Sequence, residues 1–273
     1  IKPDGIYLDG TIGPGGHATQ ILKKLIDGGK VVGIDRDEEA LDICKQNLKA
    51  SSSILSLYHN SYNNLDKILA AEGLSAFNGV LLDLGLSSLQ LGSKNRGFSY
   101  RSGGSLDMRY DQSSGSGAGK LINQTDQDSL AQIFKEYGEE RLAFRIAKSI
   151  KEMTAMNTIA DLREAIRRCT PPNHRDRTFA RIFQALRIAV NEELDILQQF
   201  LAKFIDFLRP GGRIVIISYH SLEDRLVKHS FKELASGGTL GILTKRPITA
   251  TEKERKNNRR AGSAKLRAAV KVA

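Results

Sequence analysis

The sequence contains little cysteine and no long apolar run. Only Cys44 and Cys169 occur among its 273 residues, which argues against a disulfide scaffold or a cysteine metal site and fits a reducing compartment. No apolar stretch approaches the ~18 residues of a membrane-spanning helix, and no secretory signal is visible. We therefore expect a cytoplasmic protein that does not bind a membrane. The length suits one large domain, or a domain with a smaller one inserted.

Positive charge is in excess and is concentrated late in the sequence. The formal net charge is +10, and the residues from 245 onward include ten basic side chains but only two acids, Glu252 and Glu254. A concentration of this kind indicates a polyanionic partner, most simply nucleic acid. The alternative is a solvated, partly disordered end, which is common for charged segments.

A glycine-rich segment lies close to the N-terminus, at residues 9–17 (DGTIGPGGH). Apolar residues before it predict a short strand, and apolar residues at helical spacing after it predict a helix. Glycines between a strand and a helix let a ligand approach the backbone and the unpaired N–H groups of the helix. The spacing Gly13-x-Gly15-x-x-Ala18 also fits a nicotinamide-dinucleotide fingerprint or a purely structural turn.

Two predicted strands end in a carboxylate. Residues 30–35 end at Asp35, about 20 residues after the glycine segment, which is the usual place for an acid that binds a ribose diol. Residues 77–83 end at Asp83. The alternation of strands and helices over this part of the chain predicts a parallel sheet covered on both faces. Because the carboxyl ends of parallel strands meet at one edge, we expect a ligand site there.

The alternation breaks after Asp83. Residues 84–119 are rich in glycine and serine and have no clear period, which in a compact domain is typical of functional loops. The next predicted elements are helices at residues 125–153, 158–170 and 178–208 and a buried strand at 213–219. The sequence therefore predicts an α/β domain formed by residues 1–100 and 186–273, the latter with the basic tail, interrupted by a mainly helical insert at residues 101–185.

Nine short motifs follow one another along the chain. They are residues 9–17 (DGTIGPGGH), 33–37 (GIDRD), 82–91 (LDLGLSSLQL), 96–99 (RGFS), 106–109 (LDMR), 137–140 (YGEE), 183–188 (FQALRI), 220–225 (HSLEDR) and 263–267 (SAKLR). In these motifs and their order the chain resembles the S-adenosylmethionine-dependent cytosine-N4 methyltransferases of small-subunit ribosomal RNA, known as the RsmH or MraW family.

The resemblance implies a fold, an activity and partners. The fold is a Rossmann-like class I methyltransferase sheet with an inserted helical domain for substrate recognition. The activity is transfer of a methyl group from S-adenosyl-L-methionine to the exocyclic N4 of a cytosine in small-subunit ribosomal RNA. The partner is that RNA or the small ribosomal subunit, and the oligomeric state stays open.

The family's cofactor contacts correspond to a set of residues near the predicted strand ends. Glycines bring the backbone close to the methionine part of the cofactor, Asp35 accepts from the ribose hydroxyls, and Tyr62 offers a flat surface to the adenine. Tyr62 equally suits a core position, and His17 a helix start. The set is Gly15, Gly16, His17, Asp35, Tyr62, Asp83 and Gln90.

Asp83 is the candidate catalytic residue. The methyl group arrives activated on a sulfonium, so no metal is required, but the lone pair of cytosine N4 is delocalised into the ring. An acceptor for the N4 hydrogen would make that nitrogen more nucleophilic, and Asp83 with the backbone carbonyls near Leu84 and Gly85 could supply it. The alternative for Asp83 is a cofactor contact alone.

Several basic residues are candidates for RNA binding, although a solvated helix face is the alternative for the first two. They are Arg181, Arg187, Arg260, Lys265 and Arg267. The motif at residues 220–225 has two interpretations: a helix cap made by Ser221 with Asp224, or a rim of the active site.

Two other functions remain to be distinguished from the methyltransferase. A non-catalytic RNA-binding or ribosome-assembly protein could retain the cofactor fold as a scaffold. A nicotinamide-dependent oxidoreductase would explain the glycine spacing and Asp35, but not the motif from Asp83 to Gln90 or the basic tail.

Overall fold

The computed structural model describes residues 1–272 and divides the chain into two compact units. The first unit comprises residues 1–85 and 194–273, and the second comprises residues 86–193. The insert predicted at residues 101–185 falls inside the second unit, which extends farther on both sides. Among residues 1–272, no helix combines the length and the apolar character needed to cross a membrane.

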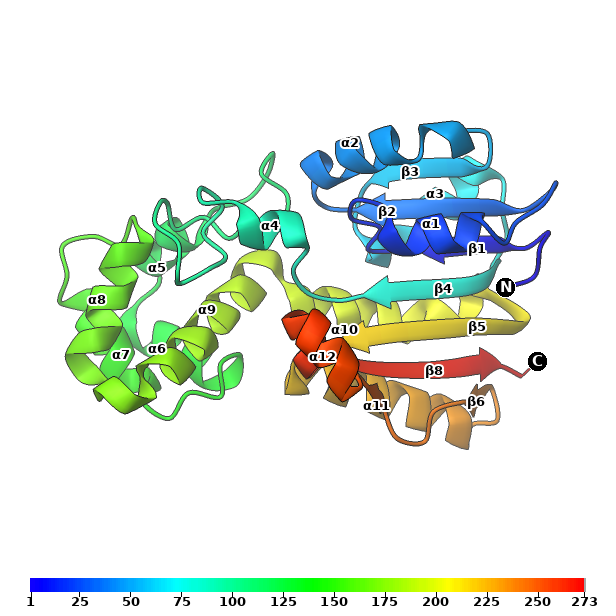
Figure 1. Ribbon diagram of the computed structural model, residues 1–273. Helices are drawn as coiled ribbons and strands as arrows, with labels where there is room; N and C mark the ends of the chain where they lie inside the picture. The colour runs from blue at the N-terminus through cyan, green and yellow to red at the C-terminus, as the bar shows by residue number, and fades with distance from the viewer. Residues whose placement is uncertain (273) are drawn as a thin grey trace. The chain divides into compact units, whose positions relative to one another are not determined.

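The first unit is built on one sheet with the strand order β3-β2-β1-β4-β5-β8-β6, which Figure 1 shows as successive arrows; β7 pairs only with β8. The strands are β1 (Ile6–Asp9), β2 (Lys30–Asp35), β3 (Leu55–His59), β4 (Phe77–Asp83), β5 (Leu208–Ser218), β6 (Leu240–Ile242), β7 (Ile248–Thr249) and β8 (Lys265–Lys271). Strands β1 to β5 are parallel, whereas β6, β7 and β8 are paired antiparallel. The order reverses between β1 and β4, where such folds bind ligands. The predicted Rossmann-like α/β fold is confirmed.

Helices pack on both faces of this sheet because successive strand residues point to opposite sides. Val32 and Ile34 of β2 lie in a core with side chains of α3, α10 and α11, including Phe200. Val31, the residue before Val32, lies on the other face in a core with α1 and α2, including Cys44. The helices of this unit are α1 (Gly16–Leu22), α2 (Glu38–Asn47), α3 (Leu65–Glu72), α10 (Glu193–Lys203), α11 (Ser221–Ser236) and α12 (Glu252–Asn257), with α10 starting at the last residue of the second unit.

The second unit is helical around its own core. Its helices are α4 (Ser88–Gly92), α5 (Ala118–Gln124), α6 (Gln127–Glu136), α7 (Ala143–Lys151), α8 (Ile159–Cys169) and α9 (Arg175–Asn191). Thr158 and Asp161 form a capping box at the start of α8, which begins where the helix at residues 158–170 was predicted. The residues between α4 and α5 form no regular element, in agreement with the predicted loop. Arg96 orders this loop by donating to the carbonyls of Arg109 and Tyr110.

Two predicted helices are each broken in the structure. The helix expected at residues 125–153 is α6 and α7, and Glu139 between them has a left-handed φ of 49°. The helix expected at 178–208 is α9, α10 and a short 3-10 turn at Phe204–Phe207, with Glu192 at φ 52°. The prediction was wrong at these points because apolar residues at helical spacing are buried on both sides of each break. One left-handed residue does not interrupt the pattern.

The basic end of the chain is folded, as α12, a 3-10 turn at Arg259–Ser263 and β8, so the expectation of partial disorder was wrong, although residues 251–260 are solvent-exposed. Strand β8 lies between β5 and β6 in the sheet. Arg267 of β8 is only 7% exposed, and its Nε donates to Asp224 Oδ1 of α11 over 2.7 Å. Lys265 Nζ lies 3.4 Å from Asp224 Oδ2. One acid of the same unit thus contacts two of the three basic side chains of this strand, Lys265 and Arg267.

We expect Asp224→Ala to destabilise the fold, because it leaves Arg267 buried without its partner. The free energy of unfolding should fall by about 3 kcal/mol in urea titrations. Asp66→Ala is the matched control, since Asp66 and Lys203 form a 3.7 Å pair in which both side chains are more than half exposed. That control should change stability by less than about 0.5 kcal/mol. If both substitutions lower the free energy of unfolding equally, Asp224 is not a structural partner of the buried Arg267.

Candidate active site at the carboxyl edge of the sheet

The glycine segment connects β1 to α1 by a turn that only glycine accommodates well. Gly13 and Gly15 have φ values of 52° and 93°, in the left-handed region. A Cβ on Gly15 would also lie 2.8 Å from Leu48 Cδ1, which leaves no space for a side chain. A Cβ on Gly16, at the start of α1, would meet no atom within 4 Å. The turn therefore presents a bare backbone and open space at the N-terminus of α1.

Asp35 ties the end of β2 to this turn. Its Oδ2 accepts from the N–H of Gly13 at 2.8 Å, and its Oδ1 accepts from the N–H of Asp37 at 2.9 Å. Burial raises the pKa of Asp35 to about 6, although these two hydrogen bonds oppose the shift. The carboxylate therefore fixes the geometry of the glycine turn. Its predicted contact with a ribose stays a prediction.

Asp83, the last residue of β4, is held from three sides. Its Oδ2 lies 3.3 Å from Nε2 of His17, and its Oδ1 accepts from the hydroxyl of Tyr219 at 2.9 Å. Its backbone N–H donates to Oγ1 of Thr11 at 2.7 Å. The hydrogen bond to Asp83 raises the pKa of His17, and burial together with the Asp83 charge raises the pKa of Tyr219 above its usual value. The structure thus brings two predicted site residues, His17 and Asp83, into contact.

Asp9 at the end of β1 is a third carboxyl group in this region. It is fully buried, and among residues 1–272 its Oδ2 has no hydrogen-bond partner. Burial raises the pKa of Asp9 to about 7; His17 lowers it, and the charges of Asp35 and Asp83 raise it. An unpartnered buried oxygen beside the open glycine turn is a place for a polar group of a ligand.

Asp9 and Tyr219 lie in the site but were not predicted as site residues. The signal that identified Asp35 and Asp83, an acid at the end of an apolar strand, could have identified Asp9 but not Tyr219. Asp9 is also the last residue of a strand, and Tyr219 directly follows β5. An aromatic residue after an apolar strand is usually part of a core, and for this reason Tyr219 was not singled out.

Two other predicted cofactor residues have structural roles in the described chain. Tyr62 follows β3, is 9% exposed and packs edge-on against Phe200, with 5.5 Å between ring centroids. This position agrees with the core interpretation of Tyr62. Gln90 belongs to the second unit, where its N–H donates to Ser87 Oγ and its Oε1 accepts from the N–H of Ser87 in a capping box. The cofactor roles of both residues stay predictions.

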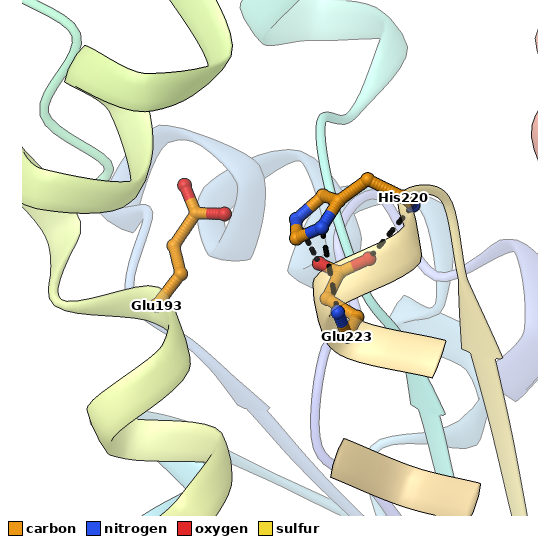
Figure 2. Close-up of side chains that lie close together, drawn as sticks. All are labelled: Glu193, His220 and Glu223. Carbon is orange, nitrogen blue, oxygen red and sulfur yellow. Dashed lines mark hydrogen bonds and ion pairs between the residues drawn. The ribbon is translucent and has the colours of Figure 1, made fainter. Parts of the chain in front are cut away.

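The HSLEDR motif forms a helix cap, but with other residues than predicted. His220 and Glu223, shown in Figure 2, make the capping box of α11 in place of Ser221 and Asp224. The N–H of Glu223 donates to Nδ1 of His220, and Oε2 of Glu223 accepts from the N–H groups of His220 and Tyr219. This cap fixes the backbone of Tyr219, whose hydroxyl holds Asp83.

The predicted RNA-binding residues differ in how far their charge is already balanced. Arg187 forms two 2.8 Å bonds to Glu193, the third residue drawn in Figure 2, within a pair that is nearly buried. Arg181 is about half exposed and lies 3.6 Å from Glu140. Arg260 is exposed, whereas Arg267 and Lys265 contact Asp224 as described above. The exposed positions are the better candidates, and none of the five assignments is tested by these contacts.

We expect Asp9→Asn to change how stability depends on pH. The pKa of Asp9 is near 3.8 in the unfolded chain and about 7 in the folded protein. Its protonation therefore stabilises the folded state fully at pH values below 3.8, and this stabilisation is lost as the pH rises through about 7. Asparagine does not titrate. Between pH 5 and pH 8 the parent should therefore lose about 2–3 kcal/mol of unfolding free energy that the variant does not lose. The melting temperature of the variant, relative to that of the parent, should rise accordingly over this pH range. If the melting temperatures of variant and parent differ by the same amount at pH 5 and pH 8, the pKa of Asp9 is not raised by burial.

Comparison with known proteins identifies the family. The protein described as "Ribosomal RNA small subunit methyltransferase H" of Kosmotoga olearia is 46% identical over 274 residues, which cover 98% of this chain and 92% of the relative. The protein of that name from Halothermothrix orenii is 43% identical and covers 99% and 94%. A crystal structure described as a putative rRNA-methylase from Clostridium thermocellum aligns with 14% identity and a TM-score of 0.45, covering 100% of this chain and 91% of that one. Residues 1–272 match the MraW methylase family, and the chain belongs to that family.

Proposed function

We propose that this protein methylates the exocyclic N4 of a cytosine in small-subunit ribosomal RNA. The methyltransferase activity, the S-adenosylmethionine donor and the ribosomal RNA substrate follow from the family and from the name that its relatives share. The target atom is the proposed part. The family assignment also removes the reason for the nicotinamide oxidoreductase, which rested on the glycine spacing and Asp35.

The residues of the first unit fit this donor. Gly16 leaves open space where a side chain would block a ligand, and the N-terminus of α1 points its unpaired N–H groups there. Asp35 stands at the end of the second strand, where a ribose diol is bound in such folds. Asp9 has a buried oxygen without a hydrogen-bond partner in the described part of the chain. When bound, S-adenosylmethionine supplies a methyl group on a positively charged sulfonium, which is favoured beside these carboxyl groups.

The observation that carries the proposal is the way Asp83 is held. A carboxylate that accepts a hydrogen bond from the N4–H group of cytosine increases the electron density on that nitrogen and directs its lone pair. It can do so only if its own orientation is fixed, because positioning supplies much of the rate. Tyr219 donates to one oxygen of Asp83 and His17 contacts the other, so the carboxylate is fixed and still has lone pairs to offer.

Asp35→Ala should weaken binding of S-adenosylmethionine by roughly 10- to 100-fold, or about 1.5–3 kcal/mol, with the fold intact. The loss includes the direct contact with the ribose and the loosened glycine turn, since Asp35 also binds the N–H of Gly13. Isothermal titration calorimetry measures it, and circular dichroism checks the fold. Affinity equal to that of the parent would show that Asp35 does not hold the donor.

Asp83→Asn should lower the single-turnover rate of methyl transfer at saturating donor by ~10- to 1,000-fold, because the transition state loses a charged acceptor. Tyr219→Phe removes only one support of that carboxylate and should cost roughly tenfold. The assay follows labelled methyl groups into small-subunit RNA, which also distinguishes an enzyme from a non-catalytic binding protein. If both variants transfer at the parent rate and only donor affinity changes, Asp83 is a binding residue.

A further inference from the structure

A hollow lined by arginines lies in the second unit, away from any residue assigned above. Its volume is about 430 Å³, within the range of ligand sites in proteins. Helix α8, the start of α9 and the loop before α5 contribute its walls. The lining includes Arg101, Arg163, Arg167 and Arg175, together with Tyr100 and Phe179, and a single acid, Asp176.

The positive charge of this hollow is not balanced by the protein. Within residues 1–272, none of the four arginines has a carboxylate oxygen within 4.0 Å. Elsewhere in the chain the arginines at 109, 187 and 267 are each paired with an acid. The guanidinium of Arg175 is instead held by the backbone carbonyls of Thr170 and Arg167, which are neutral acceptors. Uncompensated guanidinium groups that converge on one hollow favour an anionic ligand with several oxygens.

One of these arginines has a buried donor without an acceptor. Nε of Arg163 is inaccessible to solvent and has no hydrogen-bond partner among the described residues. A buried donor of this kind costs free energy unless a ligand or an ordered water satisfies it. The guanidinium carbon of Arg163 lies 6.0 Å from the ring centroid of Phe179, which also lines the hollow.

Aromatic groups stand beside the charge in a layered arrangement. Tyr100 stacks on Phe179 with 5.5 Å between centroids and 26° between planes. The guanidinium of Arg101 lies 5.6 Å from the centroid of Tyr100 and is solvent-exposed. Single-stranded RNA is bound by this combination, since bases stack on aromatic rings or guanidinium planes while arginines contact the phosphates.

We propose that this hollow binds a phosphodiester of single-stranded RNA, with a neighbouring base stacked at the Arg101 end of the layers formed with Tyr100 and Phe179. The choice of RNA over another polyanion rests on the proposed function. A free phosphate would use the same guanidinium groups but would gain nothing from the aromatic layers. The hollow is thus a subsite for the substrate strand that is separate from the carboxylate site of the first unit.

The test compares the double variant Arg101→Ala with Arg167→Ala against the single variant Arg168→Ala. Both substituted side chains of the double variant are exposed, so the core is preserved. Arg168 follows Arg167 on α8, is about half exposed, pairs with Glu164 at 3.5 Å and does not line the hollow. Fluorescence anisotropy with a labelled single-stranded segment of small-subunit ribosomal RNA measures the dissociation constant over a range of salt concentrations.

The double variant should bind this RNA about tenfold or more weakly. The slope of log K, where K is the association constant, against log salt should become shallower by about 0.7–1.4, which corresponds to the loss of one or two phosphate contacts. Arg168→Ala should stay within about twofold of the parent. Identical affinities and slopes for the two variants would overturn the proposal. So would pyrophosphate binding that depends on the two arginines while RNA binding does not, because the hollow would then hold a free anion.

The assay does not depend on catalysis, so the two proposals can fail separately. If the parent binds RNA through these arginines but transfers no methyl group, only the proposed reaction is rejected. If the parent methylates RNA and the double variant binds it as tightly as the parent, only the hollow is rejected.

Discussion

The fixed orientation of the Asp83 carboxylate is the constraint on which the rest of the first unit depends. Three segments distant in sequence hold Asp83. The loop after β1 accepts from its backbone N–H through Thr11, whereas helix α1 and the end of β5 contact its carboxylate through His17 and Tyr219. They meet only because β1, β4 and β5 are neighbours and parallel, with their carboxyl ends at one edge. The cap of α11 adds a further support, since Glu223 binds the backbone of Tyr219. The geometry of the site therefore depends directly on the order of the strands in the sheet.

Much of this site could be predicted from the sequence because it obeys a rule of position. A carboxylate at the end of an apolar run falls at the ligand edge of a parallel sheet, and Asp35 and Asp83 do so. Tyr219 could not be assigned in this way, since its role depends on where β5 lies relative to β4, and residues 86–193 intervene between these strands in the sequence. The strand β8 was missed for a related reason. Its basic residues have the composition of a solvated tail, and the burial of Arg267 depends on Asp224, which lies on another element.

The arginines of this protein fall into two classes by their partners. Arg187 and Arg267 are bound to acids and contribute to the folded structure, although their motifs suggested contact with RNA. Arg101 and Arg167, which lie outside the recognised motifs, have no acid partner within 4.0 Å among residues 1–272 and line a hollow. Sequence shows where basic residues are dense but not whether an acid elsewhere in the fold neutralises them. Net charge is therefore a weaker guide to a binding surface than unpaired charge.

The order of strands in the sheet has a consequence for synthesis of the chain. Residues 86–193 form a continuous unit with its own core, so they can fold as soon as they leave the ribosome. The first unit is split, and β8 must enter between β5 and β6, both of which are made before it. Until residues 265–271 have been synthesised, β5 presents an unpaired edge capable of pairing with other chains. A nascent polypeptide of this protein thus passes through a stage at which its second unit is finished while its catalytic sheet is still open.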